Sequence, residues 1–294
     1  MTYLNAPTAI ILDDFESNLA AAELREFGKL SWLFGGKPLV NHILEELIQI
    51  GVQTCFILTK QNAKQLSDNI LSIFRWDSRM NIETLNYDLD KEAVLKNFSA
   101  LANPSGLLIV EGNNMRGRLI KCFLDKAQNV EADCVEAQSN NQALGLTLLN
   151  SGASTIVTVA KVELENTIYQ PLQTCSDFST ANFKLLKGGF PGLHPRLAPI
   201  IGLPLWQHNR ASVHRKTALE NEIFIERGAR VARACHLNQV LINRDAYVSR
   251  GAELDNVLLM PGAFISPNKY ISNAIVSGDQ IIPLDEKSKE ARMF

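Results

Sequence analysis

A repeat of 17 residues near the C-terminus is the feature that most constrains the fold of this chain. Two aliphatic columns and one alanine column share this interval. They are Val231, Val248 and Ile265; Leu237, Leu254 and Ile271; and Ala229, Ala246 and Ala263. One aliphatic residue about every six positions, with small residues between, is the pattern of hexapeptide β-helices. The sequence therefore predicts a short left-handed parallel β-helix of three coils over residues 222–276, since an ordinary β-sandwich edge would show this spacing only by accident.

Three aromatic residues fall at positions of the repeat that face outward. They are Tyr247, Phe264 and Tyr270. A regular row of exposed aromatic side chains favours association between subunits. We therefore expect a homo- or hetero-oligomer that forms through the β-helix.

The first two-thirds of the chain alternates between apolar strands and amphipathic helices. Strands are predicted at 8–12, 54–59, 82–86 and 107–111, and helices at 38–51, 62–74 and 92–101. This alternation predicts a Rossmann-like α/β domain, with helices on both faces of a mainly parallel sheet. Ligands are expected at the carboxyl ends of the strands, in the loops after Leu12 and Val110.

The predicted domain boundaries follow from these two patterns. Residues 1–210 are assigned to the α/β domain, 211–280 to the β-helix and 281–294 to a C-terminal tail. Residues 170–207 contain five prolines and are expected to be irregular. This segment either covers the cleft of the α/β domain or bridges the two domains.

The segment 34–59, FGGKPLVNHILEELIQIGVQTCFILT, is similar to a stretch of the sugar-phosphate nucleotidyltransferases, in which a GGKPL motif opens a helix that ends in a glycine. The order of an α/β domain and a β-helix also resembles this family, in particular the mannose-1-phosphate guanylyltransferases and glucose-1-phosphate adenylyltransferases. The resemblance covers about the first 115 and the last 75 residues. It implies a GT-A type domain and a reaction in which an NTP and a sugar 1-phosphate condense to a nucleotide sugar and pyrophosphate.

The phosphate-binding loop of that family is not preserved in this chain. Family members carry GGxGTRL after the first strand, and its glycines let the backbone approach the phosphates closely. Here Leu12 is followed by Asp13 and Asp14, and a third carboxylate stands at Glu16. The resemblance makes Leu12, Asp13 and Asp14, together with Gly112, the nucleotide-binding candidates. Two like charges about 4 Å apart repel by about 4 kcal/mol at an effective dielectric of 20, so an acidic loop opposes triphosphate binding unless a metal ion intervenes.

The metal site implied by the resemblance is also changed. The family's magnesium-binding aspartate follows a glycine at the next strand end, and Asn113 takes its place here. A neutral amide supplies no charge, whereas hard divalent cations favour carboxylates. Glu111 is the other candidate ligand, but we expect its side chain to point to the other side of the strand end, since alternate residues face opposite ways. Mg²⁺ is thus expected as a cofactor only if the chain is active, and Asp125 or Asp133 would favour activity if either lay near Asn113.

Lys29 is the one candidate catalytic residue. It stands where the family's PKP signature places a phosphate-contacting lysine, although both prolines are replaced. The alternative is a solvated surface lysine. Arg116 and Arg118 lie at an expected helix start and are interpreted as solvated, and Lys37 of the GGKPL motif is interpreted as structural.

Two hypotheses for function follow from these departures. The favoured one is a nucleotidyltransferase homologue that has lost catalysis and serves as a regulatory, sugar-nucleotide-binding or scaffolding subunit. The alternative is an active nucleotidyltransferase with a GDP-mannose-like product, in which Lys29 and Glu111 carry a rebuilt site. A place in polysaccharide biosynthesis is implied by the family resemblance alone.

Charge and hydropathy exclude several kinds of partner. Lysine plus arginine number 29 against 31 acidic residues, so no net field favours nucleic acid. No stretch reaches the roughly 18 apolar residues of a membrane span, and the N-terminus has no signal-peptide pattern. We therefore expect a cytoplasmic protein that binds a nucleotide or sugar phosphate, with no nucleic-acid partner and no membrane span.

Overall fold

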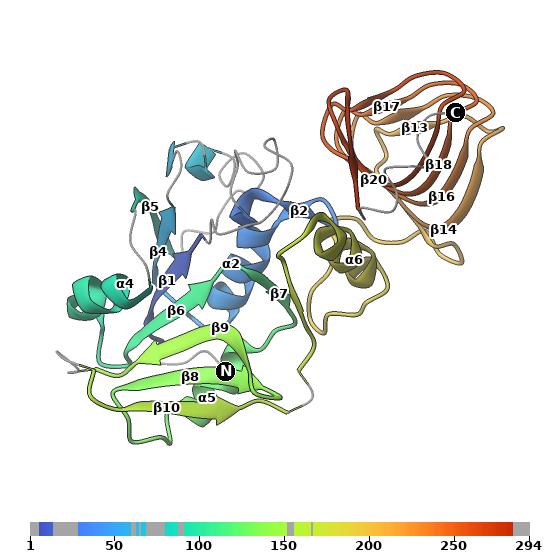
Figure 1. Cartoon of the computed structure of the whole chain (residues 1–294). Helices are drawn as coiled ribbons and strands as arrows, with labels where there is room; N and C mark the ends of the chain where they lie inside the picture. Colours follow the sequence, from blue (N-terminus) through green and yellow to red (C-terminus); the bar gives the residue numbers. More distant parts are fainter. Residues whose placement is uncertain are drawn as a thin grey trace.

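The computed structural model of the chain is a mixed α/β protein with mostly parallel sheets (Figure 1). It describes residues 6–13, 29–59, 63, 64, 66–68, 80–87, 91–151, 156–165 and 167–284. Asp14 lies outside the described residues, as does most of the helix predicted at 62–74. No helix in the described ranges combines the length and apolar character that a membrane crossing requires.

A seven-stranded sheet, in the order β10-β8-β9-β6-β1-β4-β5, organises the N-terminal part. Its strands are β1 (Thr8–Leu12), β4 (Thr54–Thr59), β5 (Asn81–Asn86), β6 (Leu107–Glu111), β8 (Cys134–Ser139), β9 (Gln142–Leu149) and β10 (Val159–Glu163). Strand β9 is antiparallel to both its neighbours, and the other four pairings are parallel. Because β1 lies between β4 and β6, the carboxyl ends of these three strands meet at one edge of the sheet.

Helices pack against both faces of this sheet. Helices α2 (Leu39–Gln49), α5 (Ile120–Ala127) and α6 (Cys175–Leu186) contribute to the core on one face, and α4 (Lys91–Phe98) to the core on the other. The alternation of side chains along β1 divides these cores, since Ala9 and Ile11 belong to the first and Ile10 to the second. Helix α6 lies within the segment 170–207, so the expectation that this segment is irregular is wrong for its helical part.

Short elements connect the larger ones. They are η1 (Lys29–Ser31), η2 (Ser99–Leu101), the pair β2 (Leu33–Phe34) and β3 (Lys37–Pro38), and the pair β7 (Asn114–Arg116) and β11 (Tyr169–Pro171). Strands β2 and β3 form a hairpin whose two turn residues, Gly35 and Gly36, both have positive φ, at 54° and 80°. Two glycines meet this requirement without steric cost, so the first part of the GGKPL motif forms a tight hairpin turn.

The C-terminal part consists of two stacked sheets that share one apolar core. The larger contains β12 (Leu205–Gln207), β14 (Ala218–Ile225), β16 (His236–Ile242), β18 (Glu253–Leu259), β20 (Tyr270–Ser277) and β21 (Gln280–Pro283), and the smaller contains β13 (Ser212–Val213), β15 (Arg230–Val231), β17 (Tyr247–Val248) and β19 (Phe264–Ile265). All pairings are parallel except β20 with β21. Strand β12 joins this part before residue 211, and β21 includes the start of the predicted tail.

The register of these strands follows the 17-residue repeat. Val231 pairs with Val248 and Val248 with Ile265, and all three side chains are buried. Leu237 pairs with Leu254 in the other sheet. A register shift between Glu220 and Ile223 lengthens the repeat locally in β14.

Residues with positive φ, at which the backbone turns a corner, recur every 17 residues. Three sets have positive φ: Gly228, Asp245 and Gly262; Ala234, Gly251 and Asn268; and Gln239, Asn256 and Asn273. Glycine, asparagine and aspartate occupy seven of these nine positions, which suits a conformation that other residues adopt at a cost. The amide side chains at one corner also bond along the stack, since Asn256 Nδ2 donates to Asn273 Oδ1 over 2.7 Å.

An outward-facing apolar column of the C-terminal strands packs onto the α/β part. In β16, Val240 and Ile242 point into the C-terminal core, whereas Leu241 between them belongs to the core that includes α2 and α6. The equivalent residues of the other strands in this sheet do the same; they are Trp206, Phe224, Leu258, Ile275 and Ile282. Figure 1 shows α6 standing between the sheet of the α/β part and the C-terminal strands.

Candidate functional site

The carboxylate of Asp13 is held by hydrogen bonds where β1 ends. The backbone N–H of Leu30 donates to Asp13 Oδ1 over 3.3 Å, and the hydroxyl of Thr59, at the end of β4, donates to Oδ2 over 3.0 Å. The Asp13 side chain is only 8% exposed. The residue that the resemblance makes a nucleotide-binding candidate therefore bridges the ends of β1 and β4 to η1.

Residues 29 and 30 cover the neighbouring end of β6. Lys29 is 2% exposed, so the alternative of a solvated surface lysine is wrong. A Cβ at Gly112 would lie 2.5 Å from Leu30 Cδ2 and 3.0 Å from the carbonyl oxygen of Leu12, to which the Gly112 N–H donates. Leu12 and Gly112 are thus brought together where β1 and β6 end, with the Leu30 side chain packed over the glycine and Lys29 next to Leu30 in the chain.

The side chains after β6 are joined in a chain of hydrogen bonds. Asn113 Nδ2 donates to Glu111 Oε2 over 3.2 Å, and Asn114 Nδ2 donates to Asn113 Oδ1 over 2.7 Å. The expectation that Glu111 points away from Asn113 is therefore wrong, because the chain turns at residues 112 and 113, directly after β6. The two candidate metal ligands do lie together.

The donor set at this place does not suit Mg²⁺. Glu111 supplies one carboxylate, while the amide oxygen of Asn113 accepts from Asn114 and its amide nitrogen faces Glu111. A hard cation needs several oxygen ligands, preferably carboxylates. Across the described ranges, no three His, Cys, Asp or Glu side chains lie close enough together to hold a metal ion. Asp133 supplies no further ligand here. It precedes β8, at the opposite ends of the strands from Glu111, and its carboxylate accepts hydrogen bonds from residues 157 and 158.

A second polar cluster lies between α2 and β7, close to the end of β6. It contains His42, Glu46 and Arg116, which line a cavity of about 10 Å³, room for about one water molecule. Arg116 is 5% exposed and donates through Nη1 to the carbonyl oxygens of Glu111 and Leu144, so the expectation that it is solvated is wrong. This arginine links the buried cluster to the end of β6.

Burial shifts the pKa values of the acidic and basic groups of this cluster in opposite directions. Burial raises the pKa of Glu46 to about 7, although the Ile120 N–H donates to Oε1 over 2.7 Å and Arg116 stabilises the charged form. Burial lowers the pKa of His42 to about 4, against the hydrogen bond between Nε2 and the carbonyl oxygen of Phe34. Arg116 also has a lowered pKa, because burial outweighs its attraction to Glu46 and Glu111. Sequence analysis missed this cluster, although His42 and Glu46 at i and i+4 on an apolar helix are a visible signal.

The GGKPL motif has a structural role in the described part of the chain. The Gly35 N–H donates to Asn182 Oδ1 on α6 over 3.0 Å, and the Gly35 carbonyl accepts from the N–H of Arg196. Lys37 Nζ forms a salt bridge with Glu45 at 2.8 Å, which agrees with its interpretation as structural. The motif thus holds α2, α6 and the approach to the C-terminal strands together.

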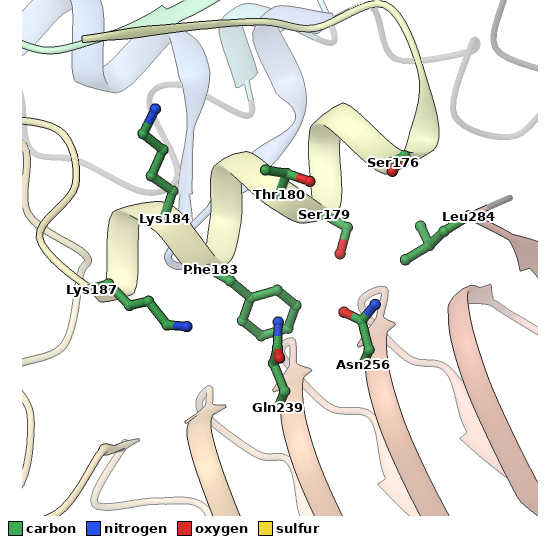
Figure 2. Close-up of a pocket in the computed structure, with 9 residues that line it drawn as sticks. All are labelled: Ser176, Ser179, Thr180, Phe183, Lys184, Lys187, Gln239, Asn256 and Leu284. Carbon is green, nitrogen blue, oxygen red and sulfur yellow. The ribbon is translucent and has the colours of Figure 1, made fainter.

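A cleft between α6 and the C-terminal corners is a third feature, which sequence analysis did not predict. It has a volume of about 390 Å³. Figure 2 shows the residues that line it, which come from α6 and its C-terminal end, from the mid-strand corners of β16 and β18 and from the chain after β21: Ser176, Ser179, Thr180, Phe183, Lys184, Lys187, Gln239, Asn256 and Leu284. The spacing of these α6 residues is helical, but it gives no sign of what the helix faces.

Comparisons with known proteins add no assignment to this geometry. The chain matches no protein-family model, and a search of curated proteins finds no significant match.

Proposed function

We propose that this chain is a sugar-phosphate nucleotidyltransferase homologue that does not catalyse nucleotidyl transfer and serves as a sugar-nucleotide-binding or scaffolding subunit. The supporting observation is the hydrogen bonding of Asp13, whose two carboxylate oxygens accept from Leu30 N–H and Thr59 hydroxyl. In this proposal, the acidic strand end has become a structural brace, where a catalytic member would present free backbone N–H groups to a triphosphate.

The proposal includes a finer description of the fold. The N-terminal part is a Rossmann-like domain of the GT-A type, supported by the order β5-β4-β1-β6 with all three pairings parallel. The C-terminal part is a left-handed parallel β-helix, supported by the 17-residue register and by three left-handed corners in each repeat. Its ligand would be a nucleotide sugar or sugar phosphate, and its setting the cytoplasm.

Electrostatics at the strand ends favour the silent homologue over the active enzyme. Transfer to a sugar 1-phosphate requires compensation of the triphosphate charge, usually by Mg²⁺ and basic side chains. Asn113 and Glu111 supply a single negative charge between them, and their polar atoms already bond to one another. Lys29 is a cation at this edge, but its side chain is buried.

The test is pyrophosphate release by the purified protein with Mg²⁺, each of the four NTPs and a panel of sugar 1-phosphates. The Asn113→Asp variant is measured beside it, with Asn129→Asp in the exposed turn after α5 as the matched control. We expect no turnover by the unmodified protein and weak binding of a nucleotide sugar by calorimetry. Turnover by the unmodified protein would instead establish the active nucleotidyltransferase, and the reactive pair would identify its substrates.

A further inference from the structure

The cleft between α6 and the C-terminal corners has the properties of a ligand-binding site that is separate from the strand ends. Its volume of about 390 Å³ lies within the 300–1,000 Å³ range typical of small-molecule sites. None of the strand-end candidates, such as Asp13 or Glu111, lines it. A ligand there would contact the α/β part and the C-terminal strands at the same time.

The α6 side of the cleft presents hydroxyl groups beside one aromatic ring. Ser176, Ser179, Thr180 and Phe183 follow helical spacing, which places them along one side of the helix. Figure 2 shows the Ser179 hydroxyl and the Phe183 ring directed toward the C-terminal strands. Ser179 is 3% exposed and Phe183 4% exposed, so both lie at the base of the cleft.

The opposite side presents two amides from corner positions of the stacked strands. Gln239 and Asn256 are equivalent residues of successive repeats, with φ of 53° and 51°. Within the described part of the chain, the Gln239 amide forms no hydrogen bond, whereas Asn256 Nδ2 donates to Asn273 Oδ1 and its own oxygen accepts none. The amides thus supply both donors and acceptors opposite the α6 hydroxyls.

Two lysines lie around the cleft, and neither presents a free charge to the amides. Lys187 forms a salt bridge with Glu222 at 3.3 Å. Lys184 extends away from Gln239 and Asn256 in Figure 2, and its Nζ lies 5.0 Å from the centroid of the Phe190 ring. Neither lysine is therefore well placed for a phosphate group in the cleft, since Lys187 is paired with Glu222 and Lys184 points away from the amides.

We propose that this cleft binds a neutral saccharide of one or two rings. Sugar hydroxyls both donate and accept hydrogen bonds, which matches the serine and threonine hydroxyls and the amides of Gln239 and Asn256. The C–H groups of a sugar ring pack against an aromatic face such as that of Phe183. A wholly apolar ligand is disfavoured, because the hydroxyls and amides of the lining would lose water without gaining partners.

The test is titration of the full-length protein with D-glucose, D-mannose and maltose, followed by saturation-transfer NMR and calorimetry. D-glucose 1-phosphate is the charged comparison and glycerol the acyclic one. The variant is Gln239→Gly, because glycine accepts φ of 53° and the amide is removed with its two methylene groups without backbone strain. Ala234→Gly is the matched control, since Ala234 is an exposed corner of the same repeat with φ of 58° and does not line the cleft.

We expect at least one neutral saccharide to bind, with affinity about fivefold weaker in Gln239→Gly and unchanged in Ala234→Gly, as loss of one neutral hydrogen bond predicts. Failure of all three saccharides to bind overturns the proposal, and so does equal binding by the two variants. Tighter binding of glucose 1-phosphate than of glucose, sensitive to Gln239→Gly, overturns the neutral class. If glucose 1-phosphate binds equally well to the unmodified protein and to Gln239→Gly, it binds at the strand ends. That result would bear only on the proposed function.

Discussion

Gly36 of the β2–β3 turn lies directly against Phe224 of β14, so that a Cβ on Gly36 would stand 2.8 Å from Phe224 Cζ. The same Cβ would come within 2.5 Å of Glu226 Oε2. Both contacts are with the C-terminal strands, and Arg196 Nη1 lies 3.8 Å from Glu226 Oε1 beside them. The turn is therefore part of the interface between the α/β part and the C-terminal part.

We expect Gly36→Ala to lower the free energy of unfolding by about 2–4 kcal/mol. The φ of +80° is unfavourable for alanine, and the new methyl group meets packed side chains that must shift. Gly188→Ala is the matched control, because Gly188 has a φ of +72° but nothing within 4 Å of the added Cβ. Urea denaturation should show a loss of about 1 kcal/mol for Gly188→Ala. Equal losses in the two variants would show that the contact with Phe224 is unimportant.

The elements that the sequence predicted well are those whose apolar pattern has one dominant period. Strands 8–12, 54–59 and 107–111 match β1, β4 and β6, because each is a short apolar run in a sheet covered on both sides. The columns of residues 17 apart also match the observed strand register, because stacking of successive repeats makes equivalent residues neighbours.

The elements that the sequence missed depend on contacts distant in the chain. Helix α6 begins with a capping box of Thr174 and Asp177, a local signal that was present but was outweighed by the surrounding prolines. Its neighbours could not be predicted, because the partners of Asn182 and Lys187 are 147 and 35 residues away, at Gly35 and Glu222. The same holds for the strand-end site, where the distance along the chain between Asp13 and Thr59 is 46 residues.

The brace at Asp13 gives a second prediction. Asp13→Ala removes the acceptor for the Leu30 N–H and the Thr59 hydroxyl, and a buried donor left without a partner costs about 1–3 kcal/mol. We expect a loss of about 2–4 kcal/mol in urea denaturation at pH 7. Thr59→Val removes only one of the two bonds and should cost about half as much. A neutral result for Asp13→Ala would argue that this carboxylate is kept for ligand binding.

The buried pair on α2 predicts an unusual pH dependence of stability. Glu46 has a folded pKa of about 7 against an ordinary value of 4.5, so its contribution is full below pH 4.5 and is lost as pH rises toward 7. His42 has a folded pKa of about 4 against an ordinary value of 6.5, so its contribution is full above pH 6.5 and is lost as pH falls toward 4. Between pH 4.5 and 6.5 the two slopes oppose each other and largely cancel.

Single substitutions should separate these slopes. In Glu46→Gln, which keeps an acceptor for the Ile120 N–H, stability should rise with pH between 4.5 and 6.5 by up to about 1.4 kcal/mol per unit. In His42→Gln, which keeps a donor for the Phe34 carbonyl, stability should fall with pH over 4.5 to 7 by a similar amount. Denaturation at half-unit intervals of pH measures both. Parallel curves for the three proteins would show that neither group has a shifted pKa.

The outward-facing aromatic residues give the last prediction, which concerns assembly. Tyr247 and Phe264 are 38% and 48% exposed, and their rings stack with centroids 5.6 Å apart and planes 8° from parallel. Tyr270, on the neighbouring sheet of the same part, is 56% exposed. In the proposed scaffolding role this surface contacts a second copy of the chain, because burying large rings is favourable and the flat stack needs no rearrangement.

We expect Phe264→Ser to raise the dissociation constant of the oligomer at least about tenfold. Light scattering after size-exclusion chromatography measures this change. The fold should be unaffected, since the side chain is half-exposed and its neighbour Ile265 supplies the buried column. Val159→Ser is the matched control, because Val159 is 57% exposed on β10 at the edge of the other sheet. A wild-type protein that remains monomeric at high concentration would contradict self-association through this surface. Dimers that resist Phe264→Ser but dissociate with Val159→Ser would place the interface at the sheet edge instead.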